Sequence, residues 1–262
     1  MDEEQKVDMK RIVFLLAVCM LLTACDRKTG DFEYAWQYHY IDSRYDNGKN
    51  MAAVDIISKY EPQVAPLMEI IGSTDRTIES RRGPESELSN LAADIVREKA
   101  EEIFGETVEI GMVNFGGIRT SMPKGDVRVY DIYSIFPFDN YLVVCKVKGS
   151  NLRKFLENYA AKGYVECFSG VEMVIDGNRL TKCNVGGKPL DDNRIYNFGT
   201  INFLLDGGDG SRIGSYSEEI LRREDVFIRD AVVDYIKKLT AEGKKIDPRT
   251  DGRVVIKNSE RR

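Results

Sequence analysis

The hydrophobic positions of this chain follow two periods, which alternate from about residue 76. Between Pro84 and Gly105 apolar residues recur every three or four positions, which predicts an amphipathic helix. Helical spacing returns after Ser150, a candidate helix cap, and over 224–241. Apolar or alternating runs predict strands at 107–113, 127–133, 140–148, 194–200 and 253–257, and a hairpin of 171–175 with 179–185. This alternation predicts a mixed α/β fold in which layered mixed β-sheets pack with helices.

The segment before this region has a weaker pattern. Residues 51–71 carry apolar positions at helical spacing, but Pro62 and Pro66 interrupt them, so we expect a kinked or two-part helix. Residues 25–50 show neither period, which predicts a tether or lead-in to a domain that covers 51–262.

The N-terminal residues are typical of an export signal. Ile12–Leu22 is an apolar run of eleven residues after Lys10 and Arg11, too short to span a bilayer comfortably. It leads into Leu22-Thr-Ala-Cys25, which resembles a bacterial lipobox. We therefore expect residues 1–24 to be a lipoprotein signal peptide, with lipidation at Cys25 and an exported, membrane-anchored product, periplasmic or at the cell surface. An uncleaved anchor or a buried helix is the alternative.

Charge and histidine content narrow the classes of function. Lys and Arg number 38 against 43 Asp and Glu, a net charge of -5, which argues against binding to a nucleic acid polymer. The single histidine, His39, is expected at the surface or in packing. A metal hydrolase that needs several imidazole ligands cannot be built from these residues alone, so we expect this chain to bind no metal or cofactor itself.

Three cysteines follow Cys25. Cys145 lies in an apolar run and is expected to be a small buried side chain rather than a reactive thiol. Cys167 and Cys183 flank the predicted hairpin strand and are candidates for a disulfide, which the spacing leaves open. No CxxC spacing occurs, so a zinc site is not expected.

Two glycine loops carry the candidate chemistry. Asn114-Phe-Gly116-Gly117-Ile-Arg119 follows a predicted strand, and its arginine offers a planar fork suited to phosphate or carboxylate. Gly207-Gly208-Asp209-Gly210 forms the second loop. Neither loop alone is specific: the first is not a P-loop or a dinucleotide fingerprint, and the second lacks the alternating ligands of an EF-hand.

The order of the motifs is more specific than any one of them. Asn114 to Arg119, then Phe136-Pro-Phe138-Asp-Asn140, the turn Lys148 to Leu152, and Asn202-Phe203 before Gly207 follow one another along the chain. This set resembles the C-terminal domain of the 5′-nucleotidase / UDP-sugar hydrolase family over about residues 55–257. The resemblance implies that domain's layered fold and a role in binding a nucleotide or nucleoside.

The resemblance also implies roles for individual residues. Asn114 and Arg119 match family residues that contact the phosphate and ribose side of the substrate, although Phe115 stands where the family usually has glycine. Arg82, with Arg81 as the alternative register, matches another substrate-binding arginine. The remaining matches are Phe138 and Phe203 for stacking the base, Asp209 for the ribose hydroxyls and Asn140 for a base contact. Two aromatic faces that stack a base contribute about 1–3 kcal/mol per base by analogy with single-strand binders.

Catalytic residues are not expected in this chain. The family's N-terminal domain holds two metal ions, which generate the nucleophile and clamp the phosphoryl group, and its Gly-Asn-His motif does not occur here. The favoured hypothesis is therefore the substrate-binding half of a split 5′-nucleotidase, inactive alone, whose divalent metals sit on a separately encoded metallophosphoesterase. A freestanding nucleotide- or nucleoside-binding lipoprotein is the alternative. A degenerate interaction domain is disfavoured, because such a domain has no need of the full set of matched residues.

Overall fold

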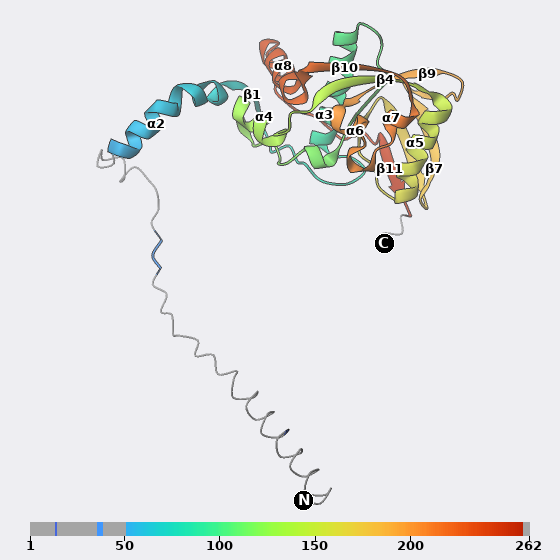
Figure 1. Ribbon diagram of the computed structural model, residues 1–262, viewed down its shortest axis with the longest axis horizontal. Coiled ribbons are helices and arrows are strands. Elements are labelled where there is room, and N and C mark those ends of the chain that lie inside the picture. The colour runs from blue at the N-terminus through green and yellow to red at the C-terminus, as the bar shows by residue number, and fades with distance from the viewer. Residues whose placement is uncertain (1–13, 15–35, 39–50, 259–262) are drawn as a thin grey trace, which may run out of the picture. The chain divides into compact units, whose positions relative to one another are not determined.

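The computed structural model describes residues 14, 36–38 and 51–258 (Figure 1). The predictions of a signal peptide, of lipidation at Cys25 and of a surface His39 fall on residues outside these ranges. The chain divides after Asp55, and the architecture below concerns the unit from Ile56 onward. None of the helices among the described residues combines the length and the apolar character that crossing a membrane requires.

The two-part helix expected over 51–71 is present. Helix α2 spans Met51–Val64 with Pro62 inside it, and a 3₁₀ turn follows at Ala65–Met68. Pro66 lies in the first turn of that 3₁₀ segment, where a proline's missing N–H needs no partner. Strand β1, Ile70–Thr74, then enters the body and pairs antiparallel with β3, Gly125–Arg128.

Helix α3, Glu87–Phe104, has the strongest local determinants in the chain. The Ser86 side chain accepts from the Ser89 N–H at 3.1 Å while Ser89 Oγ accepts from the Ser86 N–H at 2.8 Å, which forms a capping box. Gly105 ends the helix in the left-handed conformation at φ 70°. The predicted apolar face is largely buried and packs against two strands, β2 at Ile110–Val113 and β5 at Cys167–Ser169.

A five-stranded sheet lies at the centre of the body, with strand order β10-β4-β9-β2-β5. Its only parallel pair in the described residues is β2 with β9. The strands are β2 Ile110–Val113, β4 Tyr141–Lys148, β5 Cys167–Ser169, β9 Ile195–Ile201 and β10 Ser217–Phe227. Three predicted strands, at 107–113, 140–148 and 194–200, are thereby confirmed within a few residues as β2, β4 and β9, and β2 is buried along its whole length.

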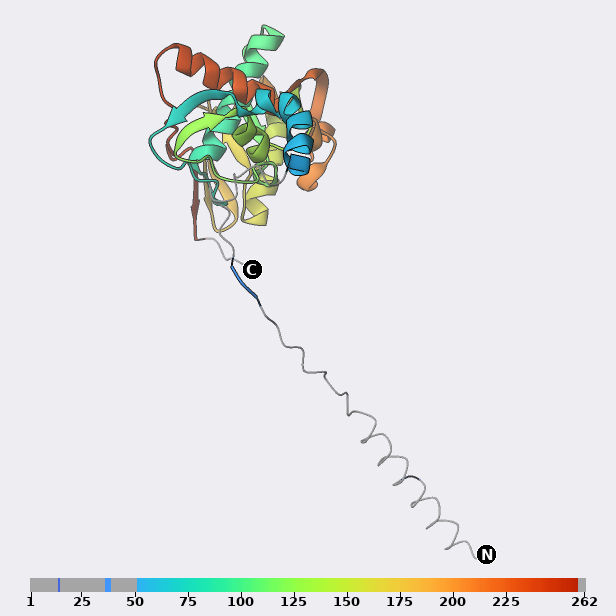
Figure 2. The same cartoon turned by 90° about the vertical axis from the view of Figure 1, so that its left-hand side faces the viewer.

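A second sheet of four strands has the order β11-β6-β7-β8. The predicted hairpin is confirmed as β6 Val171–Asp176 with β7 Arg179–Val185, and β11 Val254–Lys257 runs parallel to β6. The short β8, Lys188–Pro189, pairs with β7. Helix α5, Gly149–Lys162, packs against β4 and β7. Helix α8, Ile228–Ala241, packs against β1 and α3 (Figure 2).

Two predictions about elements were wrong because tertiary pairing overrode the local pattern. The strand expected at 127–133 ends at Arg128, and Val129–Ile135 forms helix α4. The Asp131 carboxylate caps the start of this helix by accepting the Arg128 N–H at 2.7 Å. The helix expected from 224 begins only at Ile228, because the residues before it belong to the edge strand β10. That charged strand is held by its ladder with β4 rather than by an apolar face.

The expected helix cap at Ser150 is also corrected. Helix α5 begins at Gly149, with Lys148 at the cap position and no side-chain cap. The N–H groups of Gly149 and Ser150 donate instead to the carbonyls of Arg194 and Asp192, at 2.8 and 3.0 Å. A side chain at Gly149 would place its Cβ 1.9 Å from the Asp191 carbonyl oxygen, so this close approach requires glycine.

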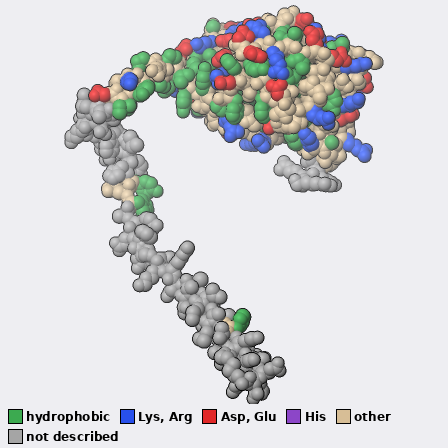
Figure 3. Space-filling model, in the orientation of Figure 1, with side chains coloured by type: hydrophobic (Ala, Val, Ile, Leu, Met, Phe, Trp, Pro, Cys, Tyr) green, Lys and Arg blue, Asp and Glu red, His purple; other side chains and the backbone are tan. Residues whose placement is uncertain are grey.

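The three cysteines among the described residues are free thiols. Cys145 is fully buried in β4, which confirms the expectation of a packing residue, and burial raises its pKa to about 11. Cys167 and Cys183 form no disulfide, so the bridge that the spacing left open is not made. The surface of the body carries acidic and basic side chains interspersed over the face seen in Figure 3, in keeping with the nearly balanced charge.

Candidate functional site

The first glycine loop leaves the carboxyl end of the buried strand β2. Residues Phe115–Gly117 form a 3₁₀ turn, closed by the Gly117 N–H donating to the Asn114 carbonyl at 3.1 Å. Asn114 is almost fully buried, and a Cβ on Gly117 would lie 2.8 Å from its Oδ1 atom. Glycine is therefore needed here because the Asn114 side chain folds back over the turn.

The second glycine loop lies against the first. Asn114 Nδ2 donates to Asp209 Oδ2 at 2.6 Å, across 95 positions of sequence. Asp209 adopts the left-handed conformation at φ 51°, between Gly207 at φ 98° and Gly210 at φ 68°. An aspartate in this conformation is uncommon, and such local strain occurs where the surrounding structure requires it. The two loops that the sequence singled out separately thus form one continuous surface.

The predicted stacking residues are exposed aromatics beside these loops. Phe138 is 46% exposed and Phe203 is 40% exposed. The Arg119 guanidinium lies 5.9 Å from the centre of the Phe138 ring, while its Nη1 donates to the Gly116 carbonyl at 3.1 Å. A Cβ on Gly208 would lie 2.4 Å from the Phe203 ring, so the ring can occupy this position only because residue 208 is glycine.

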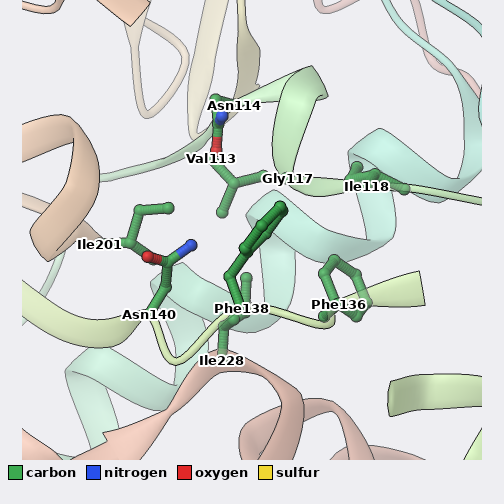
Figure 4. A pocket seen from close by; sticks show the side chains of 9 residues that line it. All are labelled: Val113, Asn114, Gly117, Ile118, Phe136, Phe138, Asn140, Ile201 and Ile228. Atoms are coloured by element: carbon green, nitrogen blue, oxygen red, sulfur yellow. The ribbon is translucent and has the colours of Figure 1, made fainter. Parts of the chain in front are cut away.

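Two pockets border the turn. The first contains Phe138 and Asn140, together with Asn114 and Gly117; Figure 4 shows the Phe138 ring in its middle, with Asn140 and Ile201 on one side and Phe136 on the other. Its walls are otherwise apolar, contributed by Val113, Ile118, Ile201 and Ile228. This pocket offers an apolar surface with amide groups at its edge.

The second pocket has a volume of about 600 Å³ and is more polar. Arg82, Gly116 and Asp209 line it together with Tyr164 and Glu166. Arg82 lies in the loop before α3 and is exposed, whereas Arg81, the alternative register, is not among the residues that line this pocket. The structure therefore divides most of the predicted residues between two neighbouring pockets, with Asn114 to Gly117 between them. Arg119, Phe203, Gly207 and Gly208 line neither pocket.

Sequence reasoning missed the buried carboxylate of Glu166. Its Oε2 atom accepts the Phe115 N–H at 2.8 Å, and the residue is only 6% exposed. Burial raises the pKa of the Glu166 carboxyl and Asp209 raises it further, while the Phe115 N–H, Arg82 and Lys162 act in the opposite direction. One acidic residue within the otherwise apolar run Tyr164 to Phe168 was the signal that could have identified it.

Metal ligation has no candidate in the part of the chain that the structure describes. No three side chains of His, Cys, Asp or Glu are grouped there so as to hold an ion. The arrangement instead combines exposed aromatic rings, guanidinium groups and a carboxylate–amide pair, which can stack a flat ring, neutralise an anion and accept hydrogen bonds from hydroxyls.

Comparisons with known proteins consistently find 5′-nucleotidases and related proteins. A family model described as 5′-nucleotidase, C-terminal domain, matches residues 63–215. Protein UshA of Yersinia enterocolitica is 31% identical over 161 residues, which cover 59% of this chain and 29% of that protein. The NAD 5′-nucleotidase of Haemophilus influenzae is 27% identical over 214 residues, which cover 70% of this chain and 36% of that protein.

Solved structures agree with these sequence matches. The crystal structure of a 5′-nucleotidase precursor from Thermus thermophilus has a TM-score of 0.66 and 27% identity, covering 79% of this chain and 43% of that chain. The Haemophilus influenzae NAD nucleotidase has a TM-score of 0.61 at 20% identity, which shows a shared fold. The chain spans less than half of the length of each of these relatives.

Proposed function

This chain belongs to the 5′-nucleotidase C-terminal domain family, and we propose that it is the nucleotide-binding half of a split 5′-nucleotidase acting in nucleotide catabolism. In this proposal the chain supplies the contacts to base, ribose and phosphate. A separately encoded metallophosphoesterase supplies the divalent metals and the attack on phosphorus. The chain by itself has no phosphatase activity.

The observation that carries the proposal is the hydrogen bond between Asn114 and Asp209. It joins the two glycine loops, each of which holds residues matched to family ligands, into one surface. Phe138 and Phe203 leave aromatic faces in solvent beside that surface, where a base can stack. Arg119 and Arg82 supply positive charge for the phosphate.

Remote contacts of this kind affect the chemistry of the partner. Base stacking and ribose contacts lie away from phosphorus, so their binding energy can align the phosphoryl group against the metals of a partner enzyme. We therefore expect the mixture of the two chains to have a lower KM for AMP than the phosphoesterase alone, and a preference for nucleotides over other phosphate esters.

A steady-state assay on AMP with each chain singly and together tests this proposal. Arg119→Ala should lower kcat/KM of the mixture about tenfold or more, the scale of one charge-assisted contact of about 1.5–3 kcal/mol. Arg179→Ala is the matched control, since Arg179 is likewise an exposed arginine but lies at the start of β7, on neither glycine loop. Chelator-sensitive turnover by this chain alone would refute the split enzyme. AMP binding without any effect on a phosphoesterase would favour the freestanding binding lipoprotein.

The proposal also places the protein outside the cytoplasm, anchored through a lipid on Cys25. The support is the apolar run Ile12–Leu22 followed by the lipobox-like residues that end in Cys25. Cys25→Ser should release the protein from the membrane fraction or leave its signal uncut, whereas Cys145→Ser should not change its distribution. An unchanged mass and an unchanged distribution of the Cys25→Ser protein would refute the anchor.

A further inference from the structure

The buried carboxylate of Glu166 has no role in the set of ligands matched to the family. It lies between α5 and β5, on a different segment from either glycine loop. Its Oε2 atom accepts the backbone N–H of Phe115, the residue next to Asn114, at 2.8 Å. Hydrogen bonds from a backbone N–H to a carboxylate are stronger than those between neutral groups, so this contact holds the start of the turn firmly.

The same residue of the turn is held from its other side. Phe115 is 7% exposed and belongs to the hydrophobic core, and the Ile118 N–H donates to the Phe115 carbonyl at 3.1 Å. Side chain, N–H and carbonyl of Phe115 are thus all engaged. Where glycine at this position would leave the turn free to shift, phenylalanine with Glu166 anchors it.

Burying this carboxylate opposes folding. The charged groups that face Glu166 are Asp209 in the second glycine loop, Arg82 in the loop before α3, and Lys162 at the end of α5. Tyr164 lines the same pocket as Glu166, and Tyr159 packs edge-on against Tyr164. Burial raises the pKa of both tyrosines, and the charge of Glu166 raises it further. An amide oxygen would accept the Phe115 N–H without the desolvation cost of a charge, so the contact requires an acceptor oxygen at this position rather than a negative charge.

We infer that Glu166 is a positioning residue for nucleotide binding: it holds the Phe115 N–H so that Asn114 and Asp209 meet in the geometry that the ligand requires. This inference rests on the proposed nucleotide-binding function. Through the Asn114–Asp209 hydrogen bond of 2.6 Å, movement at Phe115 displaces both loops at once. Losing the anchor therefore weakens binding without removing any of the residues matched to family ligands.

The experiment compares Glu166→Ala and Glu166→Gln with wild type in the full chain. Calorimetry measures AMP affinity, and amide hydrogen exchange measures protection at Phe115. We expect Glu166→Ala to weaken AMP binding about tenfold and to speed exchange at Phe115, whereas Glu166→Gln, which keeps an acceptor oxygen, should stay within about threefold of wild type.

Glu109→Ala is the matched control for a general loss of stability. The Glu109 side chain is also largely buried, and its Oε2 atom accepts the Asn197 N–H at 2.8 Å, at the other end of β2 from the turn. We expect this variant to lose thermal stability while keeping AMP affinity. Equal weakening by Glu109→Ala and Glu166→Ala, or equal loss in Glu166→Gln and Glu166→Ala, would overturn the positioning role.

The outcomes separate this inference from the proposed function. AMP binding by wild type with unchanged affinity in Glu166→Ala overturns the positioning role alone. No AMP binding by wild type overturns the proposed function and, with it, the role in nucleotide binding. Faster exchange at Phe115 in Glu166→Ala supports the anchoring contact in either case, and unchanged exchange overturns it.

Discussion

Gly208 offers a test of the stacking site that leaves every aromatic ring in the protein intact. In Gly208→Ala the new Cβ would lie 2.4, 2.5 and 2.6 Å from three atoms of the Phe203 ring. Carbon atoms in contact sit at about 3.5–4.0 Å, so the ring must move by about 1 Å or more. Phe203 is 40% exposed and can rotate into solvent, so we expect little loss of folding stability.

The displaced ring should cost ligand affinity. A stacked base contributes about 1–3 kcal/mol, and losing that contact corresponds to a factor of about five to about 150 in the dissociation constant. Isothermal calorimetry with AMP on wild type and Gly208→Ala measures it, with circular dichroism to confirm that the fold is retained.

A double-mutant cycle provides the control. If Gly208→Ala acts by moving the ring, it should have no further effect on AMP affinity in a Phe203→Ala background. Unchanged affinity in Gly208→Ala, or a full additional loss in the double variant, would refute the reasoning that Gly208 places Phe203 for stacking.

Three further predictions concern the buried polar groups. Asn114→Asp should place two carboxylates at the 2.6 Å contact with Asp209 and abolish AMP binding at pH 7, with partial recovery of thermal stability below pH 5. Glu166→Gln should be more stable than wild type at pH 7 in urea unfolding. Because burial raises the pKa of folded Glu166 above its ordinary 4.5, wild type loses stability as pH rises through that raised pKa. Near pH 4, where the carboxyl is largely protonated in both states, the difference between the two proteins should vanish. Each unit of difference between the folded and the unfolded pKa corresponds to about 1.4 kcal/mol in the free energy of unfolding. Cys145 and Cys167 should resist a thiol reagent at pH 8 until the protein unfolds, because burial raises the pKa of both thiols; rapid labelling of either of these two cysteines in the native protein would contradict this.

The sequence alone determined the elements whose signals are local. Helix α3 follows from its own apolar spacing, its capping serine Ser86 and the terminating Gly105, all within about twenty residues. The β6–β7 hairpin follows from alternation on both sides of a short turn, where Gly177 and Asn178 take positive φ. The family resemblance predicted the site residues without knowledge of the structure, because the motifs that carry it occur in a fixed order along the chain.

The tertiary structure decided what depends on distant partners. Strand β10 was missed because an exposed edge strand is held by backbone pairing with β4, which leaves no apolar pattern to recognise. Helix α4 formed where a strand was predicted, because its short apolar run is compatible with both the helical and the strand period and only packing in the folded protein decides between them. The contacts of Asn114 with Asp209 and of Phe115 with Glu166 join positions 95 and 51 residues apart. No local pattern encodes such pairs, since only the folded sheet brings the ends of its strands and their loops to one place.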